Sequence, residues 1–175
     1  MIKTRLTVSL LLLSITIMIF AGCGKKDGST SSDYYLRFTV SGKSFTFKGY
    51  PYASFSQDNG IYMAGIGSFQ DQGVGTKNVA SVLIGSLTAI KEGTYSGLIA
   101  PPGGGNTPSI FFSYIDDTGK TFGSLYDDNA TNTVTVTSLT GTSIKGTFSG
   151  KIYDMLDANA SPMSFEGDFY VTRVN

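Results

Sequence analysis

Apolar and polar residues alternate in short runs along most of this chain. At Leu36, Phe38 and Val40, for example, apolar side chains recur at every second position, and a period of two is typical of strands that turn one face to a core. We expect strands over residues 34–40, 44–47, 52–56, 61–69, 79–87, 93–99, 109–115, 121–126, 133–139, 143–154 and 164–174. No apolar period near 3.6 lasts for the roughly ten residues that a convincing helix needs.

Glycine, asparagine and aspartate separate these runs. Asp58-Asn59-Gly60 is a strong turn signal because Asn and Gly tolerate positive φ, and Ser41-Gly42-Lys43 and residues 116–120 also predict hairpin turns. Residues 100–108 are rich in proline and glycine and predict an exposed loop. Short strands joined by such turns predict an all-β fold, a single antiparallel β-sandwich or barrel of about ten strands.

Two of the runs indicate more about their place in the sheet. Residues 79–87 are apolar on both faces, which predicts a central strand covered on each side. Residues 143–154 place Ile144, Phe148 and Ile152 on one face and lysine, threonine and serine on the other. This second run is therefore expected to have one buried and one exposed face.

A short echo links two parts of the chain, Gly93-Thr94-Tyr95-Ser96-Gly97 and Gly146-Thr147-Phe148-Ser149-Gly150. A functional interpretation is a pair of repeated ligand-binding edges. A structural interpretation is that glycine, threonine and aromatic residues are what strongly bent strands use. One pair of pentamers is not the period that repeat arrays show, so we favour the structural interpretation.

The first 22 residues have the layout of a secretory signal peptide. Lys3 and Arg5 precede an apolar run that ends at Phe20, where leucine is usual, and the small residues Ala21 and Gly22 then lead into Cys23. Cys23 is the single cysteine of the chain, and it stands where a lipoprotein precursor is cleaved and lipidated. We expect a lipoprotein signal peptide over residues 1–22, a flexible tether over 23–33 and one β-domain over 34–175.

Lipidation of Cys23 would attach the protein to a membrane without spanning it. Two or more acyl chains hold a protein stably on a bilayer. The competing interpretation is an uncleaved transmembrane helix, but the apolar run from Leu6 to Gly22 lies at the short end of the roughly 17–25 residues that a span requires. A lipid-modified Cys23 also leaves the β-domain without a disulfide, so the domain must be stabilised by its core alone.

Composition narrows the functional classes. The chain has no histidine, which excludes Ser-His-Asp and Cys-His catalysis and histidine-based zinc sites. Lys3 and Arg5 leave with the signal peptide, so 11 of the 13 basic residues remain against 13 acidic ones, a formal balance of −2. This gives no basic surface for nucleic acid. We therefore expect no catalytic residues, no metal site, no cofactor and no nucleic-acid partner.

Four features together resemble the small uncharacterised lipoproteins of Bacteroidota. They are the lipobox, the start Cys23-Gly24-Lys25-Lys26-Asp27, the hairpin Val40-Ser41-Gly42-Lys43-Ser44-Phe45 and the strand with Gly146-Thr147-Phe148-Ser149-Gly150. In that group a lysine and acidic stretch after the cysteine acts as a surface-export signal, which Lys26-Asp27 matches in part because Gly28 replaces the second acidic residue. The resemblance implies a compact β-domain in the cell envelope, lipid-anchored to the outer membrane and either periplasmic or surface-exposed, and it carries no catalytic residues across.

Three groups of residues are candidates for chemistry. The acidic turns at Asp116-Asp117, at residues 127–132 and at residues 154–159 could supply calcium oxygens, although Asp and Asn are also preferred in turns on backbone grounds. Glu166 and Asp168 share one strand face and could form a glycosidase pair, or simply a solvated face. Tyr34-Tyr35 or Tyr50-Pro51-Tyr52 could stack on sugars. In each case we favour the structural interpretation.

The functional expectation is a lipid-anchored envelope protein with a non-enzymatic binding or structural β-domain, whose partner is a glycan or an envelope protein. One alternative is a small barrel with an apolar ligand cavity, in which Gly65, Gly67 and Gly85 mark tight bends. Another is a glycan hydrolase that uses carboxylates alone. A filled interior favours the first, an enclosed cavity the second, and two converging carboxylates the third.

Overall fold

The chain forms strands throughout the described region. The computed structural model describes residues 33–70, 77–101, 105–124, 131–157 and 159–174. The strands are β1 (Tyr35–Val40), β2 (Lys43–Phe47), β3 (Gly49–Asp58), β4 (Ile61–Phe69), β5 (Val79–Ser86), β6 (Gly93–Ser96), β7 (Leu98–Ile99), β8 (Thr107–Pro108), β9 (Ile110–Ile115), β10 (Thr121–Gly123), β11 (Thr133–Leu139), β12 (Ser143–Asp154) and β13 (Met163–Val174). The prediction of an all-β fold is confirmed.

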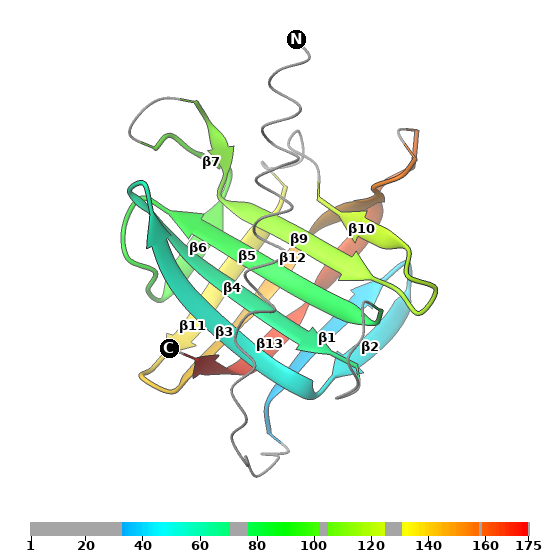
Figure 1. Ribbon diagram of the computed structural model, residues 1–175, viewed down its shortest axis with the longest axis horizontal. Helices are drawn as coiled ribbons and strands as arrows, with labels where there is room; N and C mark the ends of the chain where they lie inside the picture. The colour runs from blue at the N-terminus through cyan, green and yellow to red at the C-terminus, as the bar shows by residue number, and fades with distance from the viewer. Residues whose placement is uncertain (1–32, 71–76, 102–104, 125–130, 158, 175) are drawn as a thin grey trace. The chain divides into compact units, whose positions relative to one another are not determined.

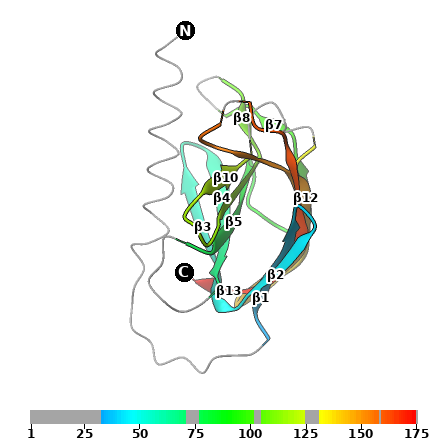
Figure 2. The ribbon, with the colours of Figure 1, turned by 90° about the vertical axis from the view of Figure 1, so that its right-hand side faces the viewer.

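The strands are arranged as two packed layers whose edges are joined by hydrogen bonds. Eleven strands follow the order β2-β1-β13-β3-β4-β5-β9-β10-β12-β11-β6, and an additional pairing of β13 with β12 closes a ring. In Figure 1, β3, β4, β5 and β9 cross in front of β11, β12 and β13. Figure 2 shows the two layers edge-on, with β3, β4 and β5 on one side, β1, β2 and β12 on the other, and the end of β13 at the lower edge between them. The domain is therefore a two-layer sandwich with a closed ring of strands.

Two short pairings join the layers. β13 runs parallel to β3, with Thr172 opposite Tyr52 and Val174 opposite Ser54, and this pairing is the exception to the antiparallel arrangement that we expect from the sequence. At the other junction, β10 pairs with the end of β12 through Phe122 and Asp154. Because β13 also pairs with β12 along most of its length, one long C-terminal strand connects both layers.

Aromatic rings fill the space between the layers. Phe112 of β9 contacts Phe148 of β12 and Phe165 of β13, with ring centroids 5.6 and 5.5 Å apart. Phe38 of β1 contacts Tyr114 of β9 at 5.3 Å. The alternation in the sequence is confirmed, since the inward positions of β1 and β12 are buried.

Three glycines on the inner face leave the space that these rings and the neighbouring backbone occupy. A Cβ on Gly146 would meet the ring of Phe169 and the carbonyl oxygen of Thr135, and a Cβ on Gly150 would meet Phe112 and Asn132. A Cβ on Gly167 would overlap the backbone of the neighbouring β1. Glycine here permits close approach of rings to backbone. The echo residues Gly146 and Gly150 therefore have a packing role, which supports the structural interpretation for the glycines.

Some sequence expectations differ from the structure. The expected strand 93–99 is divided into β6 and β7 because Gly97 has φ +75°, outside the strand region. The expected loop 100–108 contains β8, which pairs with β7. β5 is central, between β4 and β9, but its outward side chains are only partly buried, so it is not covered on both faces.

The residues from Ser32 to Asn175 form one compact unit, and every core residue belongs to it. The hydrophobic core that the described ranges form thus lies wholly within this unit. In the described ranges, no helix is long and apolar enough to cross a membrane. The expected signal peptide, Cys23 and nearly all of the expected tether lie outside the described residues.

Candidate functional site

Two parallel rows of hydroxyl side chains cross the outer face of the layer that contains β6, β11 and β12. β11 pairs with β6 on one side and with β12 on the other. The first row is Thr94, Thr135 and Thr147, and the second is Ser96, Thr133 and Ser149. Paired strands lie about 4.8 Å apart and alternate residues about 6.7 Å apart, so the hydroxyls form a regular lattice. We call these six residues the hydroxyl face.

The sequence echo accounts for this arrangement. The two pentamers are β6 with Gly97 and part of β12, and they flank β11 in matching register, with Tyr95 and Phe148 both opposite Val134. Thr94 and Thr135 also share a hydrogen bond of 3.1 Å between their hydroxyl oxygens. The favoured interpretation of the echo was thus incomplete: its glycines serve packing, but its Thr and Ser residues build one continuous polar surface.

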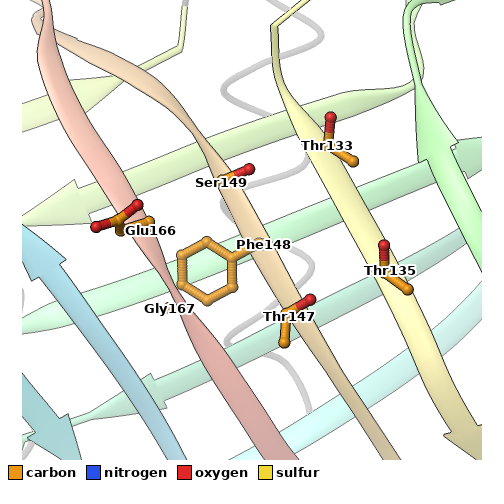
Figure 3. A pocket seen from close by; sticks show the side chains of 7 residues that line it. All are labelled: Thr133, Thr135, Thr147, Phe148, Ser149, Glu166 and Gly167. Carbon is orange, nitrogen blue, oxygen red and sulfur yellow. The ribbon is translucent and has the colours of Figure 1, made fainter.

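A shallow open concavity of about 380 Å³ lies on this surface. Figure 3 shows Thr133 and Thr135 on β11, Thr147 and Ser149 on β12, and Glu166 on the neighbouring β13. Glu166 is exposed and pairs in register with Ser149. The concavity therefore offers hydroxyl donors and acceptors together with one carboxylate.

The second carboxylate of this strand, Asp168, is engaged by neighbouring side chains. Arg37 donates from Nε to Oδ1 at 2.8 Å and from Nη2 to Oδ2 at 3.0 Å. Tyr35 donates its hydroxyl to Oδ2 at 2.7 Å, and this hydrogen bond, with burial, raises the pKa of Tyr35. The same carboxylate raises the pKa of Arg37. Both oxygens of Asp168 thus accept hydrogen bonds within the protein.

This arrangement bears on the proposed glycosidase pair. Glu166 and Asp168 do share the outer face, as their spacing predicts, but Asp168 lies in an ion pair while Glu166 faces the hydroxyl rows. A retaining or inverting mechanism needs two carboxyl groups that flank one scissile bond. The two groups here point to different neighbours, so they do not form a converging pair.

Neither of the two candidate tyrosine pairs forms one shared surface on which a sugar could stack. Tyr34 packs on Tyr170, with centroids 4.7 Å apart and planes tilted by 53°, whereas the ring of Tyr35 lies under the Arg37 guanidinium. Tyr50 is 54% exposed but Tyr52 is only 7% exposed. The two rings pack against each other with centroids 5.7 Å apart, so Tyr50 is the ring of this pair that is available to solvent.

The acidic turns use their oxygens for local hydrogen bonds. Asp116 Oδ1 accepts from the Thr118 hydroxyl at 2.6 Å and from the Thr118 and Lys120 amides at 2.9 Å. Burial tends to raise the pKa of Asp116, but these hydrogen bonds together lower it. Asp154 pairs with Lys120 at 2.7 Å, which lowers the pKa of Asp154. Residues 127–130 of the remaining turn lie outside the described residues.

The remaining candidate sites are a metal site and an apolar cavity inside the domain. Among the residues that the structure describes, no group of three or more Asp, Glu, Cys or His side chains could hold a metal ion. The space between the layers is occupied by the aromatic core. Gly65, Gly67 and Gly85 have no positive φ, and a Cβ at each would lie at ordinary distances of 3.4 Å or more from its neighbours, so neither backbone conformation nor close packing requires glycine there.

Comparison with known protein families, curated proteins and solved structures gives no significant match to this chain.

Proposed function

We propose that this chain is a lipid-anchored envelope protein whose β-domain binds a glycan without catalysing a reaction. The observation that carries the proposal is the register of β6, β11 and β12, which lines up six hydroxyl side chains in two rows. A polysaccharide presents hydroxyl groups at regular intervals, and serine and threonine both donate and accept hydrogen bonds. A shallow, open lattice of such groups suits an extended chain better than a small molecule.

The surroundings of the hydroxyl face support binding rather than catalysis. Glu166 adds a carboxylate acceptor at one edge of the rows, and Tyr34 and Tyr170 lie further along the outer side of the same layer. Tyrosine offers an apolar ring face and a polar hydroxyl to a sugar. The other carboxylate on this face of β13, Asp168, accepts hydrogen bonds from Arg37 and Tyr35. This supports a binding role without acid–base chemistry.

A glycan array probed with the unit Ser32–Asn175 tests this proposal. The variant Thr135→Arg places a bulky side chain in the middle of the hydroxyl face. Ser81→Arg is the matched control, because Ser81 lies between the buried Ala80 and Val82 and so faces outward from the other layer. We expect the natural sequence and Ser81→Arg to bind the same glycans and Thr135→Arg to bind at least tenfold more weakly. An array without a binder, or equal binding by Thr135→Arg, would refute the proposal.

A further inference from the structure

A second and separate concavity opens between the two layers, near the end of β13. It has a volume of about 180 Å³ and is lined by Phe55 of β3, Tyr62 and Met63 of β4, Ile90 after β5, Leu139 of β11 and Arg173 of β13. We call it the Arg173 pocket. Its walls are mainly apolar and aromatic, with Ser56 and the guanidinium as polar groups, and it shares β11 with the hydroxyl face but none of the six hydroxyl residues.

Arg173 is held in place by its backbone and by one ring. Its amide donates to the Thr142 carbonyl at 2.8 Å, and it stands opposite Ala53 in the parallel pairing with β3. The guanidinium carbon lies 4.5 Å from the centroid of the Phe55 ring, a favourable cation–π distance. The charged group is therefore positioned by the fold rather than extended freely into solvent.

The guanidinium lacks the partners that a partly buried arginine normally has. Among the described residues, no carboxylate lies within salt-bridge distance of Arg173, and its buried Nε has no hydrogen-bond acceptor. Arg37, by comparison, has a carboxylate on the adjacent strand. A buried donor without a partner is costly and calls for a water molecule or a ligand. The Arg173 pocket thus combines mainly apolar walls with a guanidinium that no described carboxylate neutralises.

We propose that the Arg173 pocket binds a small organic carboxylate whose apolar part is about the size of a benzene ring. The guanidinium fork matches a carboxylate in geometry and in charge, and the side chains of Phe55, Met63 and Ile90 provide an apolar lining. A cavity of roughly 150 Å³ accepts benzene, so 180 Å³ leaves little room for more. The pocket is smaller than the roughly 300–1,000 Å³ of drug-sized sites.

Titration of the unit Ser32–Asn175 with phenylacetate, followed by amide chemical shifts, tests this inference. We expect saturable shifts around Tyr62, Ile90 and Arg173 with a Kd on the order of 1 mM, as the small number of ligand atoms implies. The neutral 2-phenylethanol and the ring-free acetate and inorganic phosphate should each bind at least tenfold more weakly. Equal binding of acetate or phosphate would mean that only an anion is attracted, and absence of phenylacetate binding would also overturn the inference.

Two variants locate the binding. Arg173→Met removes the charge but keeps an apolar chain over Phe55, and Ala89→Phe fills the mouth of the pocket from an exposed position. Each should weaken phenylacetate binding at least tenfold, with a melting curve to verify folding. Lys43→Met removes a charge from the exposed start of β2 and should leave the Kd unchanged. Unchanged binding in Ala89→Phe would place phenylacetate elsewhere, and Thr135→Arg separates this site from the glycan proposal because it should not alter the phenylacetate Kd.

Discussion

The ring of Phe169 lies over the backbone of Gly146, its partner across β12 and β13, so closely that a Cβ on residue 146 would stand 2.6 Å from the ring Cζ. On the opposite side the same Cβ would overlap the carbonyl oxygen of Thr135. A ring can rotate or shift, but the carbonyl belongs to the paired backbone of β11 and cannot move without breaking the sheet. Glycine is therefore required at position 146 by packing.

Replacing Gly146 with alanine should strongly destabilise the domain. Overpacking of a filled core costs typically about 1–3 kcal/mol, and a backbone clash places Gly146→Ala at the upper end of that range or above. Gly141→Ala is the matched control, because nothing lies within 4 Å of its Cβ position; it should change stability by less than about 0.5 kcal/mol. Urea unfolding of both variants measures the difference, and equal midpoints would contradict this account of Gly146.

The ion pair between Arg37 and Asp168 should contribute little to stability. The Arg37 side chain is 59% exposed, and exposed pairs typically contribute about 0.2–1 kcal/mol. A double-mutant cycle with Arg37→Met and Asp168→Asn should give a coupling in this range that shrinks in 1 M salt, where screening is strong. A coupling above about 2 kcal/mol, or one insensitive to salt, would show that the pair is more important than its exposure suggests.

Alkaline pH should destabilise the fold through Tyr52. Burial raises the pKa of Tyr52 from its ordinary value of 10.0 to about 12. The folded state favours the neutral phenol. The stability that the neutral phenol contributes is therefore complete below pH 10, and on the order of 1–2 kcal/mol of the unfolding free energy is lost as the pH rises toward 12.

Tyr52→Phe has no phenol to ionise and provides the control for this prediction. Unfolding free energies measured between pH 9 and 12 should fall less steeply in Tyr52→Phe than in the natural sequence. Tyr52→Phe removes one phenol and leaves every other titratable side chain in place, so the difference in slope reports the ionisation of Tyr52. Identical slopes would mean that the phenol ionises as easily in the folded state as in the unfolded chain.

Replacing Cys23 should abolish lipid attachment. Cells grown with an alkyne fatty acid should label the natural sequence and the control Ser29→Ala, and both should remain in the membrane fraction. Cys23→Ser has no thiol to receive the diacylglyceryl group, so it should be unlabelled and should keep residues 1–22. Absence of label on the natural sequence would contradict the lipoprotein prediction, and protease treatment of intact cells would then test surface display separately.

Local patterns in the sequence predicted most of the strands. The period of two assigned the buried faces of β1 and β12 correctly, because side chains of a strand alternate between its faces whatever the partner strand is. Asn59-Gly60 and Ser41-Gly42 were recognised as turns, and all four residues have positive φ. β8 and the break between β6 and β7 were not predicted, because a pairing of two residues leaves almost no periodic signal.

The candidate sites required knowledge of which strands are neighbours. The repeated Thr and Ser residues of the two pentamers were visible, as was the alternating threonine of residues 133–137, but strand pairing is not encoded in a local pattern. β6 and β12 lie on either side of β11 although about fifty residues separate them in the chain. Arg173 likewise gave no signal, because its surroundings depend on β3, β4 and β11 coming together around it, with no described carboxylate within salt-bridge distance.

The sequence by itself determined the class of fold and the buried faces of strands such as β1 and β12, since each of these depends on side-chain spacing within a few residues, and it predicts the N-terminal lipobox at Cys23. The tertiary structure alone decided that Phe169 covers Gly146, that six hydroxyls form one lattice and that Arg173 faces apolar walls. These relationships join residues from distant strands, and strand register is fixed by packing of the whole core rather than by any single segment.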